Sequence, residues 1–479
     1  MHELHPPWLG LCVLLPALGA VWVKYTRDPD AARRRSLIAS GLALACAIAA
    51  WQDFRSPGPF QARDRWIPLA RFFDGDLLAV DELSAPLLPL AALICFLTNL
   101  ATLRAKVREF SFSRALASEA ILLATLGCKL PWGVVALLAA GTVPPYIELR
   151  KGNRPSRVYA IHMGLFVALL CLGQMLMPRH PLPGVVLLTA AVLLRSGVVP
   201  VHCWMTDLFE NATFGTALLF VTPMVGAYGV TRLVLPGAPQ WVLQAISLAS
   251  LFTAIYAAGM ALVQREARRF FCYLFLSHSS LVLVGLEMAT PIGLTGALSL
   301  WLSVALSLTG FGLTMRCVEF RTGRISLSSF HGLYGHVPVL AGIFLLTGLA
   351  SIGFPGTAGF VGLELLIAGA VQAFPVMGAA VVVVAALNSL AVMHAYFRIF
   401  TGKGHESSID LGVRPAERIA VLVLTALILG GGLCPQPGVT SRYQAAVGLA
   451  EARARRIDNG PPPSHRRANL SDRGSVRPR

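Results

Sequence analysis

Charged residues are scarce in this sequence. Asp, Glu, Lys and Arg make up only 13% of its 479 residues, whereas hydrophobic residues make up 55%. Because a soluble domain carries about 25% charged residues, this composition excludes a soluble enzyme. Disordered, collagen-like and disulfide-scaffold classes are excluded as well, since the apolar content is high and there are nine cysteines in the whole chain. The mean hydropathy of +0.65 indicates a membrane-embedded body.

The cysteines form no CxxC pair and show no metal-ligand spacing, so we expect no metal site and no bound cofactor. The formal net charge is +16, but basic and aromatic residues do not alternate as a nucleic-acid surface requires. Lys and Arg instead lie in the linkers between apolar runs and in the tail, where positive charge orients helices across a membrane. The bilayer, and not nucleic acid, is therefore the expected environment.

Apolar runs of the length needed to span a bilayer recur almost to the end of the chain. We predict an all-α polytopic membrane protein with about fourteen transmembrane helices. The expected runs are 8–23, 36–51, 83–103, 113–129, 131–147, 158–177, 183–201, 214–233, 240–262, 270–287, 291–315, 338–373, 375–399 and 417–434. The expected domains are N-terminal helices and an outer loop at 1–110, a core at 111–400, the last helix and its connection at 401–451, and a disordered basic tail at 452–479.

Basic linkers follow the first, third and fifth runs, which places these linkers in the cytoplasm and the N-terminus outside. The run 338–373 leaves the side of the tail open. If it crosses the membrane once, the tail lies outside; if it crosses twice, the tail lies inside. Eight arginines after residue 450 favour the inside.

The first candidate site is the passage from Leu193 to Trp204, where Arg195 precedes Pro200 inside an apolar run. Proline interrupts a helix, and an opened backbone at membrane depth must be buried in protein or line a wet cavity. An arginine there is costly and usually functional. The alternative is an arginine that snorkels to the interface near His202 and Asp207.

The second candidate is His278, which follows a basic helix start at Arg268 and is flanked by three serines. Because its unperturbed pKa is near neutrality, histidine can pass protons. A hydrogen-bonded core histidine is the alternative. The third candidate combines a second helix break at Pro355 and Gly356 with the following carboxylate Glu364.

A fourth candidate is Glu119, a carboxylate inside the run 113–129. Glu364 has an alternative of its own, since it could simply pair with a neighbouring cation.

These passages resemble the antiporter-like membrane subunits of respiratory complex I, an NADH-quinone oxidoreductase, and the large subunits of Mrp-type sodium/proton antiporters. The resemblance extends from about Asp81 to Pro437. It rests on three stretches. The first is Arg195 to Trp204, followed by Ala227-Tyr228-Gly229, and the second is Gln264-Arg265-Glu266 to His278. The third is Pro355-Gly356-Thr357 with Gly362.

The resemblance implies fourteen helices, two inverted five-helix repeats with two broken helices, and a half-channel near each break. It also implies a multi-pass protein of the cell inner (cytoplasmic) membrane that translocates protons or other cations beside further membrane subunits. Such a subunit binds no redox cofactor, so it is at most a non-redox subunit of an NADH-quinone oxidoreductase-like complex.

The sequence departs from the charged residues of that family. The position of the family's fifth-helix glutamate is occupied by Ala139 or Ala140, and that of the lysine in the first broken helix by Arg195. The position of the eighth-helix cation lies near Met224, and that of the last-channel charge is occupied by Leu363. Only the position of His278 matches. Lysine can lose its proton when buried, whereas arginine stays charged. We therefore expect a reduced relay.

Two alternatives follow. The chain could be the membrane partner in a two-component uptake system for inorganic carbon, beside a soluble zinc subunit, or an inert structural scaffold that kept the fold and lost the relay.

Overall fold

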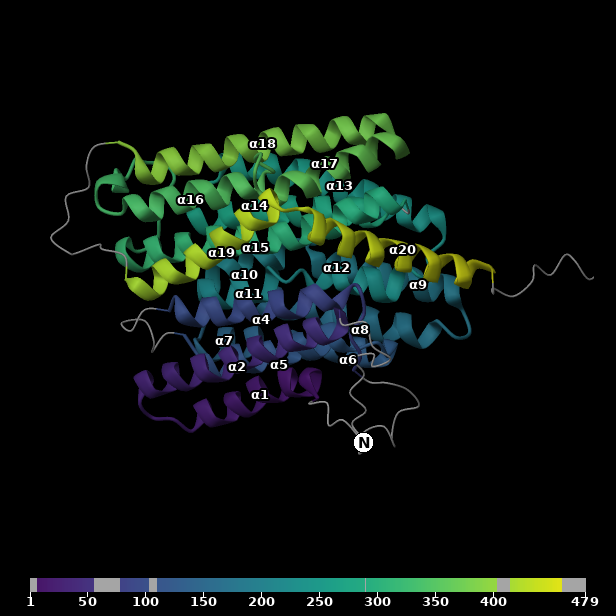
Figure 1. The fold of residues 1–479 in the computed structure, drawn as a ribbon, viewed down its shortest axis with the longest axis horizontal. Helices are drawn as coiled ribbons and strands as arrows, with labels where there is room; N and C mark the ends of the chain where they lie inside the picture. Colours follow the sequence, from purple (N-terminus) through teal and green to yellow (C-terminus); the bar gives the residue numbers. More distant parts are fainter. Residues whose placement is uncertain (1–6, 56–77, 103–109, 289, 403–413, 459–479) are drawn as a thin grey trace, which may run out of the picture.

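The computed structural model describes residues 7–55, 78–102, 110–288, 290–402 and 414–458. Helices dominate the described residues, whose only β-type pairings are two isolated bridges, Leu78 with Cys128 and Glu266 with Ser326. The all-α prediction is confirmed. The helices run roughly parallel or antiparallel to one another (Figure 1).

The first half of the chain forms helices α1 (Trp8–Lys24), α2 (Pro29–Arg55), α4 (Ser84–Leu100), α5 (Phe112–Gly127), α6 (Pro131–Gly141), α7 (Val143–Lys151), α8 (Arg157–Leu176), α9 (Pro181–Ser196), α10 (Cys203–Asn211), α11 (Phe214–Val221), α12 (Val225–Gly229) and the π-helix η2 (Val230–Val234). The second half forms α13 (Gln240–Val263), α14 (Ala267–Leu286), α15 (Pro291–Thr322), the short 3₁₀ helix η3 (Leu333–Gly335), α16 (Pro338–Ser351), α17 (Ala358–Ala373), α18 (Pro375–Phe400), α19 (Pro415–Leu433) and α20 (Gln436–Asp458).

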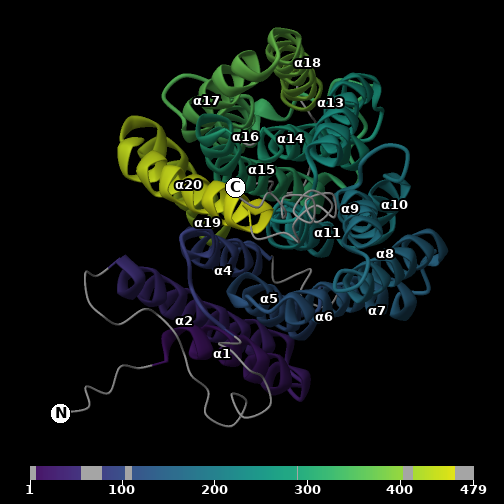
Figure 2. The ribbon, with the colours of Figure 1, turned by 90° about the vertical axis from the view of Figure 1, so that its right-hand side faces the viewer.

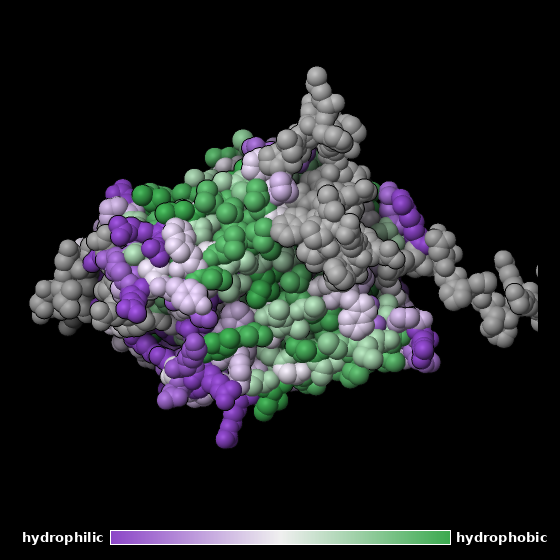
Figure 3. All heavy atoms as spheres, turned by 90° about the horizontal axis from the view of Figure 1, so that it is seen from below, coloured by the Kyte–Doolittle hydropathy of each residue, from purple (hydrophilic) through white to green (hydrophobic). Residues whose placement is uncertain are grey.

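Nine helical stretches of the described chain are long and apolar enough to cross a membrane, and five shorter apolar helices accompany them. On the face shown in Figure 3, hydrophobic side chains form a broad band across the middle of the molecule, and hydrophilic ones gather toward its ends. Viewed along the helices, α1 and α2 lie at one edge and α17 and α18 at the opposite edge (Figure 2). The most buried long helix is α14, which lies between these edges.

Two crossings are interrupted near their middle, as the prolines predict. The first consists of α9 and α10, with Pro200 between them, and the second of α16 and α17, with Pro355 and Gly356 between them. The two crossings run in opposite directions (Figure 1). The segment 338–373 is thus a single crossing, and α20 ends at the same end of the molecule at which α1 begins. The described end of α20, which carries Arg453 and Arg455, therefore lies at the end of the molecule opposite the basic linkers, whereas the arginines had favoured the same side; residues 459–479 lie outside the described residues.

Glycines in the left-handed region make both interruptions possible. Gly197 ends α9 with a φ of 75°, and Gly353 and Gly356 flank the second break with φ values of 79° and 85°. Residues with a Cβ adopt such angles at a cost, whereas glycine does not. Proline occupies the first turn of both α9 and α16, where its missing N–H has no intrahelical partner to lose.

Helix α20 was not expected from the sequence. It continues from Gln436 to Asp458, so residues 452–458 are helical and not part of a disordered tail; residues 459–479 lie outside the described residues. The helix is absent from the candidate membrane spans. It packs along α15 and follows α19 almost without a gap (Figure 1).

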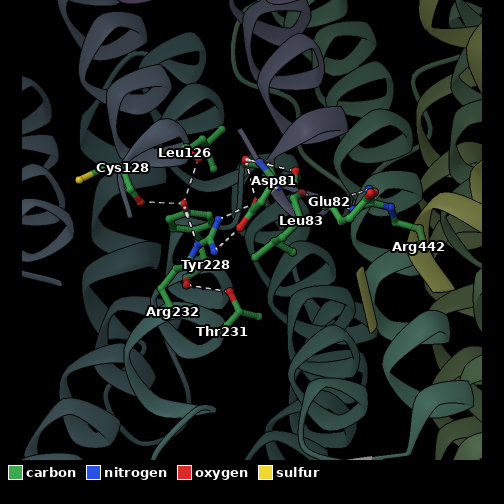
Figure 4. A network of polar contacts seen from close by, with 10 residues as sticks. Asp81, Glu82, Leu83, Leu126, Cys128, Tyr228, Thr231, Arg232 and Arg442 are labelled. Carbon is green, nitrogen blue, oxygen red and sulfur yellow. Dashed lines mark hydrogen bonds and ion pairs between the residues drawn. The ribbon is translucent and has the colours of Figure 1, made fainter. Parts of the chain in front are cut away.

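A polar clasp holds the start of α4 between distant parts of the chain (Figure 4). Asp81 accepts hydrogen bonds from both terminal nitrogens of Arg232, at 2.6 and 2.8 Å, and Arg232 also lies over the ring of Tyr228. Burial alone would raise the pKa of Asp81, but the Arg232 guanidinium and the Ser84 backbone N–H outweigh burial and lower that pKa to about 2.

The other side of the clasp is formed by α20. The buried Arg442 donates hydrogen bonds to the carbonyl oxygens of Glu82, at 2.6 Å, and Leu83, at 3.3 Å. At the junction of α19 and α20, a Cβ added to Gly432 would overlap the backbone of Gly356. The C-terminal helices therefore contact both the second helix break and the start of α4.

Candidate functional site

Arg195 is buried at the end of α9, with 6% of its surface exposed. Its Nη2 donates a hydrogen bond of 3.0 Å to the carbonyl oxygen of Phe220, and its guanidinium lies 3.8 Å from the centre of the Phe220 ring and 5.5 Å from that of Trp204. None of the ion pairs found among the described residues includes Arg195. Since the guanidinium stays inside, the snorkelling alternative does not describe its position.

Two cavities meet at Arg195. The larger, of about 50 Å³, lies between α5, α6, α7 and α11, and its wall includes Arg114, Ser118 and Thr216 besides Arg195. The smaller, of about 20 Å³, is lined by Arg195, Met224 and Ser279 among others. A cavity of roughly 10–15 Å³ holds one water, so both have room for water. Arg195 thus lies between the larger and the smaller cavity, each of which has room for water.

His278 connects α14 with the second helix break. Its side chain is 2% exposed, and its Nδ1 lies 2.8 Å from the carbonyl oxygen of Leu274. The ring also forms a hydrogen bond with the backbone of Ser351, the last residue of α16. The next residue, Ser279, lines the smaller cavity beside Arg195. The wall of the smaller cavity therefore includes both Arg195 and Ser279, the chain neighbour of His278.

Glu119 is fully buried in α5, and neither of its carboxylate oxygens has a hydrogen-bond partner among the described residues. Its electrostatic neighbours are the thiols of Cys12 and Cys95. Cys95 and Ser118, which precedes Glu119, both line the larger cavity. The unpartnered carboxylate thus lies next to the wall of the cavity that contains Arg195.

Glu364 occupies a different environment. Its side chain lies on the exposed side of α17, although it is only the seventh residue of that helix, which begins at the break. The preceding residue, Leu363, is the one that contacts Gly353 in the break. The structure therefore does not bring Glu364 together with Arg195, His278 or Glu119.

One interruption was missed in the sequence. The run 214–233, expected as a continuous helix, divides into α11, α12 and η2. Met224 adopts the left-handed region with a φ of 50°, and Trp301 donates a hydrogen bond of 3.2 Å to the carbonyl oxygen of Pro223. Pro223 was the sequence signal that could have indicated this interruption. This third interruption lies on the wall of the smaller cavity, beside Arg195.

A second missed feature is Glu148, a buried carboxylate of α7. Its oxygens accept hydrogen bonds from the Thr213 backbone N–H, at 2.9 Å, and from the Thr216 hydroxyl, at 2.6 Å. The guanidinium of Arg114 lies 3.5 Å from the same carboxylate. Because Arg114 and Thr216 line the larger cavity, the ion pair of Arg114 with Glu148 lies beside this cavity.

Within the described part of the chain, no three His, Cys, Asp or Glu side chains come close enough to hold a metal ion. Several ion pairs instead join helices at the end of the molecule that carries the basic linkers. They are Arg268 with Glu319, Arg269 with Glu210 and Arg321 with Glu417. These groups connect helices and have no part in the two cavities.

Fold and site together define a multi-pass α-helical membrane protein in which interrupted crossings lie beside buried ionisable groups. Such interruptions at membrane depth are typical of ion-transporting proteins.

A family model described as NADH:quinone oxidoreductase/Mrp antiporter, TM, matches residues 163–389. The chain is 28% identical to NAD(P)H-quinone oxidoreductase chain 4 1 of a Synechococcus species, over 94% of each protein. It is 30% identical to NADH-quinone oxidoreductase subunit 13 of Thermus thermophilus, over 56% of this chain and 57% of that protein. The chain is thus similar in sequence to antiporter-like membrane subunits of complex I and Mrp antiporters, and the family model covers slightly less than half of it.

Solved structures show the same fold. A chain of respiratory complex I from Thermus thermophilus with bound NADH has a TM-score of 0.80 and 21% identity, covering 93% of this chain and 99% of that chain. A chain of the Mrp complex from a Dietzia species also has a TM-score of 0.80, with 19% identity over 94% of this chain and 99% of that chain.

Proposed function

We propose that this protein is a proton- or cation-translocating membrane subunit of a larger assembly, with a reduced set of charged residues. The observation that carries the proposal is the sequence of groups across the molecule. The larger cavity leads to Arg195, the smaller cavity leads from Arg195 to Ser279, and the adjacent His278 reaches the second helix break at Ser351.

The groups of this path have different roles. His278 carries an imidazole, a group that can both accept and donate a proton. Arg195 keeps its charge, so it repels a proton that approaches through either cavity and sets the field in which His278 titrates. Glu119 supplies a carboxylate beside the larger cavity and can carry a proton there. The path thus contains fewer titratable groups than the one that the family resemblance implies.

We place the protein in the cytoplasmic membrane, among other membrane subunits. Glu364 supports this arrangement, because a carboxylate exposed on an otherwise apolar helix face is costly in lipid and is favourable against a neighbouring cation. Its role is therefore at the contact with another subunit and not inside this chain. NADH oxidation, where it occurs, belongs to other subunits.

Proton flux into liposomes tests the proposal. The purified chain, alone and with the subunits that co-purify with it, is compared with His278→Gln, which removes the titrating ring. His162→Gln is the matched control, because His162 lies on α8 away from both cavities. We expect His278→Gln to abolish most of the flux and His162→Gln to leave it unchanged.

Absence of flux from folded wild-type protein, with and without partners, would instead support the scaffold alternative. The carbon-uptake alternative predicts that a soluble zinc subunit co-purifies and that transport of inorganic carbon depends on it. Metal analysis of the co-purified complex distinguishes this outcome.

A further inference from the structure

We infer that the larger cavity binds a small monovalent anion, which serves as the counter-ion of Arg195. Binding of this anion does not require that protons move through the chain.

The charges around the cavity do not balance. Two guanidinium groups, those of Arg195 and Arg114, line the same cavity. One carboxylate, that of Glu148, lies within ion-pairing distance of Arg114, and its oxygens also accept hydrogen bonds from Thr213 and Thr216. A buried ion without an opposite charge is strongly unfavourable. One negative charge is therefore missing beside Arg195.

Hydrogen-bond donors are in excess as well. A guanidinium has five N–H donors, and Arg195 forms one side-chain hydrogen bond, to Phe220. The Nε of Arg114 is buried and has no partner in the described structure. Carboxylates and other small anions accept several hydrogen bonds at once, and guanidinium groups suit them in charge and geometry.

Other groups of the protein do not supply the missing charge. Glu119 lies behind the cavity wall, and both its oxygens are without a hydrogen-bond partner, so it forms no direct bond with Arg195. The aromatic rings of Phe220 and Trp204 stabilise the cation without neutralising it. Water could satisfy the donors, but it also leaves the charge uncompensated.

The space fits the ligand class. A volume of about 50 Å³ corresponds to roughly four water-sized positions, enough for a halide with water or for a planar oxyanion of four heavy atoms. The walls contributed by Leu122, Leu137 and Leu138 are apolar. A small, singly charged anion meets both conditions, whereas a nucleotide or an organic phosphate is too large.

Gly141 offers a direct test, because it lines the cavity and a Cβ added there would meet only Ile121, at an ordinary distance of 3.8 Å. Gly141→Asp places a tethered carboxylate on the wall, which should exclude the free anion. Gly141→Asn has the same shape without the charge and is the matched control.

The experiment is equilibrium binding of radiolabelled chloride and, separately, radiolabelled bicarbonate to the purified full chain in gluconate buffer. We expect saturable binding of one anion per chain, a loss of at least tenfold in affinity for Arg195→Gln and Gly141→Asp, and wild-type affinity for Gly141→Asn and for the exposed control Arg265→Gln. Saturation by chloride, by bicarbonate or by both supports the site and identifies the anion. The inference is overturned if folded wild-type protein binds neither anion, or if Arg195→Gln and Gly141→Asp bind as wild type does.

Discussion

The guanidinium of Arg195 contacts Phe220 in two ways, through a 3.0 Å hydrogen bond to its carbonyl oxygen and through its ring, whose centre is 3.8 Å away. The backbone contact is available to any residue at position 220, whereas the ring contact is not. Replacing the ring therefore isolates the cation–π contribution from the hydrogen bond.

We predict that Phe220→Leu lowers the free energy of unfolding by about 1–2 kcal/mol, since a desolvated cation–π contact is worth about that much. Thermal unfolding in detergent measures the effect. Phe252→Leu is the control, because Phe252 is 60% exposed on α13. Equal shifts in the two variants would show that Arg195 does not depend on the ring.

Arg195→Lys tests the role of a permanent charge. Lysine can release its proton when buried, whereas arginine retains it. We expect Arg195→Lys to sustain proton flux at or above the wild-type rate, and Arg195→Gln to alter its pH dependence by removing the charge beside His278. Flux that is lost in the lysine variant, in a correctly folded protein, would contradict a purely electrostatic role.

Asp81→Asn is expected to destabilise the protein by about 3 kcal/mol, because it leaves the largely buried Arg232 without its counter-charge. The pKa of Asp81 is lowered to about 2, so the folded state favours the ionised form. Its stabilisation is complete above the unfolded value of about 3.9 and is lost as pH falls through about 2. Wild type and variant should therefore converge in stability between about pH 4 and pH 2. Parallel stability curves over that range would refute the assignment.

Glu287, which follows the last residue of α14, should respond to pH in the opposite sense. Burial raises the pKa of this carboxyl group well above its ordinary value, and the nearby Arg453 opposes the shift only in part. A raised carboxyl pKa means that the folded state resists ionisation, so stability falls as pH rises from the unfolded value toward the folded one. Glu287→Gln should thus increase thermal stability at pH 8 and change it little at pH 5. A larger gain at pH 5 would disprove this account.

The junction of α19 and α20 provides a matched pair of glycines. A Cβ at Gly432 would overlap the Gly356 backbone at the second break, whereas a Cβ at Gly430 would meet nothing. We predict that Gly432→Ala lowers the free energy of unfolding by roughly 1–3 kcal/mol, the usual range for overpacking. Gly430→Ala, on the same helix, should be neutral or slightly stabilising. Thermal unfolding of the two variants measures the difference.

Composition and apolar run length were sufficient to predict the helical membrane fold, because spanning a bilayer forces long apolar helices. Proline and glycine located both expected interruptions, because these residues break or end a helix through their own backbone geometry. Pro223 also marks the third interruption, but the left-handed backbone of Met224 could not be predicted, since residues with a Cβ rarely adopt positive φ. Its conformation depends on tertiary contacts, including the hydrogen bond from Trp301 to the preceding Pro223.

The candidate site was less accessible from the sequence. Arg195 and His278 were identified because ionisable residues are rare in apolar runs. The direction of Glu364 was not predictable, since α17 is apolar on nearly every side and one residue along a helix turns the side chain by about 100°. Glu148 was missed because its partner Thr213 is 65 positions away in the sequence.

The hydrogen bond from Arg442 to Glu82 has a consequence for biogenesis. It joins residues 360 positions apart, so the start of α4 cannot acquire this partner until almost the entire chain has been synthesised and inserted. Until then the carbonyl oxygens of Glu82 and Leu83 remain open to water or to chaperones. Completion of α20 would thus mark the last step of maturation, and a protein truncated before Gln436 should remain sensitive to quality-control proteases even when all its crossings are in place.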